Sequence, residues 1–122
     1  MTLLPAVREA SIVIDMEFKT LRERLGEINF EMVRADSDAY FEAVLTSDEY
    51  DNTALKLKET LGEPIYYGSG RLSSEVRKKI SAFGGITKGQ VLYYRWERIK
   101  DIFAMFWPWR DGQHITLKAG VV

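Results

Sequence analysis

The chain has 122 residues, 46% of them hydrophobic, and a formal net charge of −1. This length fits one domain over residues 1–122 with a core that folds without disulfides, and the composition excludes disordered and fibrous proteins. The absence of cysteine excludes disulfides and thiolate zinc sites. Together with the balanced charge and an N-terminus without a long apolar run, it predicts a cytoplasmic protein that binds neither nucleic acid nor membrane.

Residues 4–25 are predicted to form one long helix. Pro5 suits a first helical turn, and Gly26 suits the position after the last turn. The stripe with helical spacing consists of Val7, Ser11, Ile14, Phe18, Leu21 and Leu25. An alternative stays open, because residues 12–18 also alternate as a strand does, and Thr20 would then begin a shorter helix.

A β-hairpin is predicted over residues 28–46. Apolar and polar residues alternate on both sides of a turn at Asp36-Ser37-Asp38. Charges from Glu31, Arg34 and Glu42 indicate that one face of this hairpin meets water.

Two helices are predicted in the middle of the chain. The first follows a capping box of Thr46 and Glu49 and stops at Gly62, and the second runs from about Ser73 to Phe83. Residues 65–67 form a short strand between them. The buried stripes are Tyr50, Ala54, Leu57 and Leu61 in the first helix, and Leu72, Val76, Ile80 and Phe83 in the second.

The C-terminal third is predicted to be a three-stranded antiparallel meander over residues 91–96, 102–109 and 115–119. Aromatic and β-branched residues favour strands there, and Asp111-Gly112 is typical of a two-residue hairpin turn. A helix competes over residues 90–106, because the apolar residues also fit helical spacing. Residue preference favours the strands.

The predicted fold class is α+β, with an antiparallel sheet of about five strands covered on one face by three helices. The N-terminal hairpin and the C-terminal meander supply the strands, and a short sixth strand is an option. The strand over residues 102–109 is apolar on both faces. Since monomers rarely leave such a face open, we expect a second copy of the chain or an apolar ligand to cover it.

No motif with a defined chemistry stands out. His114, the only histidine, is interpreted as a polar residue at the start of a strand, because a catalytic histidine needs a second placed group. No metal or cofactor is expected. The run Gly68-Ser69-Gly70-Arg71 lacks the phosphate-loop pattern, and no nucleic-acid motif accompanies Arg71, Arg77, Lys78 and Lys79.

Three functions remain. The first is a non-enzymatic interaction module that forms a homodimer through its sheet. The second is a small-molecule binding domain with an aromatic pocket for an apolar or acidic ligand. Its candidate residues are Tyr66, Tyr67, Arg71, Tyr94, Arg95, Trp96, Trp109 and Arg110. The third is a hydrolase or isomerase using the carboxylates Glu42, Glu97 or Asp101, and the lack of a paired constellation favours a protein that is not an enzyme.

Overall fold

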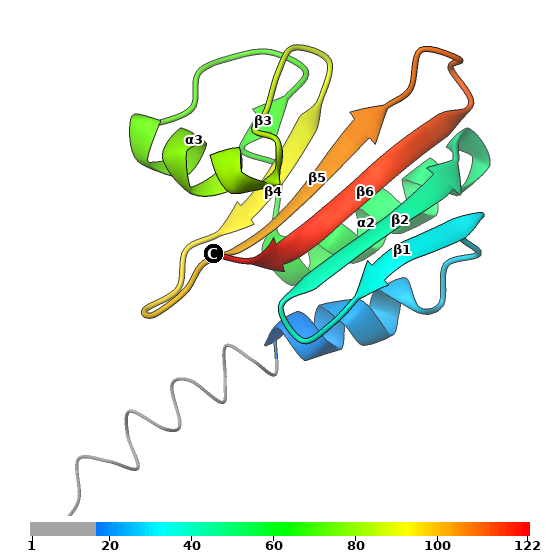
Figure 1. Cartoon of the computed structure of the whole chain (residues 1–122), viewed down its shortest axis with the longest axis horizontal. Coiled ribbons are helices and arrows are strands. Elements are labelled where there is room, and N and C mark those ends of the chain that lie inside the picture. The colour runs from blue at the N-terminus through cyan, green and yellow to red at the C-terminus, as the bar shows by residue number, and fades with distance from the viewer. Residues whose placement is uncertain (1–16) are drawn as a thin grey trace, which may run out of the picture.

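A six-stranded antiparallel sheet organises residues 17–122, the part of the chain that the computed structural model describes (Figure 1). The strands lie side by side in the order β1-β2-β6-β5-β4-β3. Their bounds are Met32–Asp36 (β1), Tyr40–Thr46 (β2), Tyr66–Tyr67 (β3), Val91–Arg95 (β4), Ile102–Pro108 (β5) and His114–Val121 (β6). The predicted α+β class is confirmed, with six strands instead of about five.

Helices occupy three places in the described chain. Residues 17–25 form the first, called helix 17–25 below. Residues 4–16 of the predicted helix lie outside the described part, and so do residues 12–16 of the alternative strand over 12–18, whereas residues 17 and 18 are helical. The 3-10 turn η1 (Ser47–Glu49) leads into α2 (Tyr50–Leu61), and α3 (Ser74–Ile80) continues into the 3-10 turn η2 (Ser81–Phe83). No described helix has the length and apolar character needed to cross a bilayer.

Of the predicted caps at the starts of α2 and α3, only the one at α3 forms. The Ser73 hydroxyl accepts a hydrogen bond from the backbone N–H of Val76 at 3.2 Å, as a helix cap should. The predicted capping box of Thr46 and Glu49 does not form, because neither side chain makes a capping bond. A turn of 3-10 helix begins α2 instead.

Residues 90–106 contain strand β4, a loop and the start of β5, as predicted, and the competing helix is excluded. Tyr93 pairs with Ala104 and Tyr94 with Phe103 in one antiparallel ladder. Every residue from Val91 to Tyr94 and from Ile102 to Phe106 is buried. Successive side chains of a strand point to opposite faces of the sheet. Because both faces of these strands are covered, a strand buries all of their apolar side chains, whereas a surface helix would bury only one stripe.

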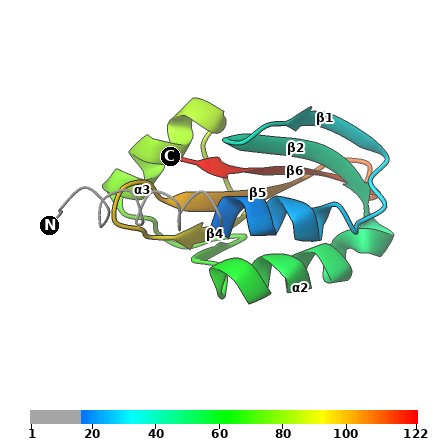
Figure 2. The ribbon, with the colours of Figure 1, turned by 90° about the horizontal axis from the view of Figure 1, so that it is seen from below.

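The first face of the sheet carries the larger core, beneath helix 17–25 and α2 (Figure 2). Phe18, Leu21 and Leu25 of the predicted stripe are fully buried there. Alternate strand residues meet them, including Tyr93 and Phe106. This confirms the described part of the first helix prediction.

The second face is covered by α3 and η2, which corrects the prediction that all three helices lie on one face (Figure 2). Val76 and Ile80 of α3 pack against Phe103 and Met105 of β5 in a second buried cluster. The reason is the doubly apolar character of β4 and β5, which needs a cover on each side. The chain itself therefore provides the cover that was expected from a partner.

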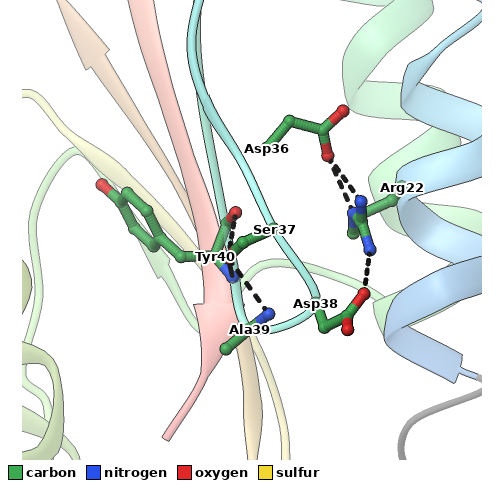
Figure 3. A network of polar contacts seen from close by, with 6 residues as sticks. All are labelled: Arg22, Asp36, Ser37, Asp38, Ala39 and Tyr40. Atoms are coloured by element: carbon green, nitrogen blue, oxygen red, sulfur yellow. Dashed lines mark hydrogen bonds and ion pairs between the residues drawn. The ribbon is translucent and has the colours of Figure 1, made fainter.

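Arg22 of helix 17–25 fastens the β1–β2 turn to the first face (Figure 3). Its guanidinium lies 2.8 Å from Asp36 Oδ1 and 3.1 Å from Asp38 Oδ1. Within the turn, the Ser37 hydroxyl accepts from the backbone N–H groups of Ala39 and Tyr40. The predicted turn thus gains a tertiary contact that spacing alone does not reveal.

Candidate functional site: the cleft beside strand β4

An open cleft of about 500 Å³ lies where α2 ends beside the last residues of β4. It arises because β3 pairs only with Val91 and Leu92, so that no strand covers the rest of that edge of β4. Gly62, with φ of 86°, turns the chain away from α2 and forms the opposite wall. The lining residues are Thr60, Leu61, Gly62, Glu63, Ile65, Tyr94, Arg95 and Trp96.

Trp96 is the most accessible aromatic residue of the cleft. The residue is 57% exposed, and its ring lies 4.9 Å from the ring of Tyr94. Large exposed aromatic residues are uncommon on a domain surface and are enriched where proteins bind other molecules. Trp96 therefore gives the cleft a flat apolar surface.

Arg95 contacts helix 17–25, α2 and the β4–β5 loop (residues 96–101) on the first face of the sheet. Its Nη2 lies 3.1 Å from Glu17 Oε1, its Nε lies 2.8 Å from Glu97 Oε1, and its Nη1 donates to the Thr60 carbonyl at 3.0 Å. Two carboxylates thus face one guanidinium. Because each nitrogen already has a partner, Arg95 holds the wall of the cleft and is not free to orient an acidic ligand.

In this arrangement the ionised form of the Glu17 carboxyl group is destabilised. Burial raises the pKa of its carboxyl group and the neighbouring Glu97 carboxylate raises it further, while Arg95 acts in the opposite direction. The folded protein consequently favours the protonated, neutral form of Glu17 more than the unfolded chain does.

Glu17→Gln is expected to raise the melting temperature at pH 8 and to change it little at pH 4. A raised pKa means that the contribution of Glu17 to stability is present below its ordinary pKa and is lost as pH rises through the folded-state value. Glutamine imitates the protonated form at every pH. Thermal unfolding at both pH values, with the exposed Glu23→Gln as control, tests this; a variant less stable than wild type at pH 8 contradicts it.

Asp101 holds the β4–β5 loop, residues 96–101, from the second face. It is 4% exposed and accepts hydrogen bonds from the Tyr94 hydroxyl, from Lys79 Nζ at 2.9 Å and from the Glu97 backbone N–H at 3.0 Å. Burial alone would raise the pKa of Asp101, but these donors outweigh it and hold the pKa below its ordinary value. Arg95 and Asp101 therefore fix the same loop from opposite sides.

Three of the eight predicted ligand-binding residues, Tyr94, Arg95 and Trp96, come together at the cleft. The others do not join them. Tyr66 is buried beneath α3, Tyr67 is exposed on β3, and Arg71 is exposed in the loop before α3. Trp109 and Arg110 follow the far end of β5, roughly 20 Å away at about 3.3 Å per strand residue.

The segment Phe106–His114 is a structural corner of the sheet. Pro108 ends β5 and pairs with Ile115, and the indole N–H of Trp109 donates to the Thr116 hydroxyl at 2.8 Å. His114 begins β6, as predicted. Its ring nitrogens contact Asp111 and Glu31, and its pKa is raised mainly by the hydrogen bond with Asp111.

The three carboxylates proposed for acid–base chemistry do not converge. Glu42 lies on β2 and accepts from the Tyr40 hydroxyl at 2.6 Å. Glu97 faces Arg95 on the first face, whereas Asp101 faces Tyr94 on the second. Among residues 17–122, no group of three or more histidine, cysteine, aspartate or glutamate side chains is placed to hold a metal ion.

The wall formed by residues 60–65 and the role of Glu17 were not predicted from the sequence. Gly62-Glu63-Pro64 signals the end of a helix, but not what lies opposite it. The contact between Glu17 and Arg95 joins residues 78 positions apart, and no local pattern reveals it. Comparison of the chain with family models, with curated proteins and with solved structures finds no match.

Proposed function

We propose that this protein is a non-enzymatic binding domain that takes a small apolar, aromatic ligand in the cleft beside β4. The observation that carries the proposal is the joint placement of Tyr94, Arg95 and Trp96 along a cleft of about 500 Å³. That volume falls within the range of small-molecule sites, roughly 300–1,000 Å³. The absence of cysteine agrees with a cytoplasmic setting.

The lining chemistry favours a neutral ligand over an acidic one. The charge of Arg95 is matched by Glu17 and Glu97, and Glu63 is paired with Lys58 at 2.7 Å. The Trp96 ring and the side chains of Leu61 and Ile65 offer apolar contact.

The three tryptophans offer site-resolved reporters for this proposal. Trp96 lines the cleft, Trp107 packs against Gly84, and Trp109 lies at the β5–β6 turn. Titration of the ¹⁵N-labelled chain with a library of aromatic fragments should shift the indole N–H signal of Trp96 and leave the other two in place.

Trp96→Leu should abolish the fragment-induced shifts of neighbouring backbone signals, whereas Trp109→Leu should preserve them. The proposal fails if no fragment moves the Trp96 signal, or if binding persists unchanged in Trp96→Leu.

Self-association through the sheet stays a prediction, but the apolar face that was expected to need a partner is covered by α3 and η2. A second copy could still pair with the edge strand β1, where Met32 and Val33 are 54% and 53% exposed. A register shift between Val33 and Ala35 interrupts the regular edge of that strand. Such irregularities oppose pairing between edges, so the cleft is the better supported site.

A further inference from the structure

The β4–β5 loop presents a patch of apolar and basic side chains that lies outside the cleft, apart from Trp96. Trp96 and Ile99 are 57% and 53% exposed, and Arg98 and Lys100 between and beside them are exposed as well. We call these four residues the loop patch. The loop projects from the end of the sheet at the lower left of Figure 1.

The acidic residues of the same loop are directed inward. The side chains of Glu97 and Asp101 are 17% and 5% exposed, because Arg95 and Lys79 hold them against the body of the domain. The outer surface of the loop is consequently positive, although the whole chain has a net charge of −1. Net charge therefore hides a local separation of charge.

Helix α3 lies beside the loop, because Lys79 contacts Asp101. The other exposed charges of α3 are Glu75, which is paired with Lys79 at 3.5 Å, and the cations Arg77 and Lys78. Within residues 17–122, no ion pair involves Arg77, Lys78, Arg98 or Lys100. In the described part of the chain, Arg98 and Lys100 thus lie without an ion-pair partner next to the exposed Ile99.

We propose that the loop patch docks on an anionic phospholipid surface. Trp96 and Ile99 enter the boundary between headgroups and acyl chains, while Arg98 and Lys100 bind lipid phosphates. Tryptophan favours this boundary, and each basic residue near an anionic leaflet adds attraction. A nucleic acid would use the cations and stack on Trp96, but it offers Ile99 no comparable partner.

The anchoring of the loop supports a docking role. Arg95 on one face and Asp101 on the other fix the loop before any partner arrives. A loop that is already ordered loses little conformational entropy on binding. The buried polar contacts thus fix the backbone from which Trp96 and Ile99 project.

Co-sedimentation of the full chain with vesicles tests this proposal. Binding is expected to vesicles of phosphatidylcholine and phosphatidylserine in a two-to-one ratio, but not to pure phosphatidylcholine, and to weaken with added salt. Ile99→Asp and Lys100→Glu should each weaken binding at least about tenfold. Matched controls are Leu55→Asp, which changes an exposed apolar residue of α2, and Lys88→Glu, which changes an exposed cation at the other end of β4.

Insertion of Trp96 has its own spectroscopic signature. Lipids brominated near the headgroup should quench the tryptophan fluorescence of wild type, and Trp96→Phe should lose that quenching. Absence of binding to the mixed vesicles overturns the proposal. So does unchanged binding by Ile99→Asp, or a preference for a single-stranded oligonucleotide over vesicles with no dependence on Ile99.

The proposal does not depend on the ligand proposed for the cleft. Arg98, Ile99 and Lys100 do not line the cleft. Ile99→Asp and Lys100→Glu should therefore leave the fragment-induced shift of the Trp96 signal in place, and each variant must retain the wild-type melting transition. Loss of vesicle binding with intact fragment binding separates the two sites.

Discussion

Gly84→Ala is expected to destabilise the protein by about 3 kcal/mol or more. A Cβ at this position would overlap with Cη2 of Trp107 and lie 2.8 Å from its Cζ2, and φ is +103°. Trp107 cannot easily move away, since Lys118 Nζ sits 3.6 Å above its ring and also donates to the Phe83 carbonyl at 2.9 Å. Chemical denaturation at neutral pH measures the loss.

Gly85→Ala provides the matched control for this prediction. Gly85 also has positive φ, +71°, but a Cβ added there would meet nothing within 4 Å. Only backbone strain opposes the change, so we expect a loss of about 1 kcal/mol. Equal losses for the two variants would contradict the close packing of η2 and Gly84 on Trp107.

Asp101→Ala is expected to cost about 3 kcal/mol at neutral pH, because it leaves the buried Tyr94 hydroxyl and the Glu97 N–H without their acceptor. Asp101→Asn should cost less, since an amide oxygen still accepts from one of these donors. Lys79→Met removes the partly exposed partner of the same carboxylate and should have the smallest effect. Thermal and urea unfolding rank the three variants.

The pH dependence of this effect follows from the lowered pKa of Asp101. A carboxyl group with a depressed folded-state pKa stabilises the protein above its ordinary pKa, near 3.9, and this contribution is lost as pH falls through the folded-state value. The difference between wild type and Asp101→Asn should therefore shrink below about pH 4. A difference that grows on acidification would show that Asp101 is not ionised in the folded protein.

Much of the fold was predictable because its determinants are local. The aromatic and β-branched residues of 102–109, the Asp111-Gly112 turn and the stripe of Val76 and Ile80 each predict an element that the structure contains. The sheet order and the side on which α3 packs were not predictable in the same way. They depend on how two apolar faces are shared among helices, which is a property of the assembled domain.

The candidate site was predictable only where it coincides with a strand end. Tyr94, Arg95 and Trp96 are consecutive, so an aromatic and basic cluster was visible in the sequence. Trp109 and Arg110 are likewise an aromatic and a basic residue, but they follow the far end of β5, because β5 runs antiparallel to β4 and carries the chain away from the β4–β5 loop. The partners that give Arg95 its role, Glu17 and the Thr60 carbonyl, come from two separate helices.

Both proposals depend on a β4–β5 loop that is held in one conformation. Arg95 joins it to helix 17–25 and α2 on the first face, and Asp101 joins it to α3 on the second. Trp96 lies between these two anchors in the chain and belongs both to the lining of the cleft and to the loop patch. A loop of this length without such anchors would sample many conformations and would present no defined surface.

Amide hydrogen exchange at Glu97 reports whether the loop is anchored in this way. The Glu97 N–H donates to Asp101 Oδ1 at 3.0 Å, whereas the N–H groups of Arg98 and Ile99 have no acceptor among residues 17–122. We expect slow exchange at Glu97, fast exchange at Arg98 and Ile99, and loss of the protection at Glu97 in Asp101→Ala. Exchange at Glu97 in the wild-type protein as fast as at Arg98 would refute the anchored loop.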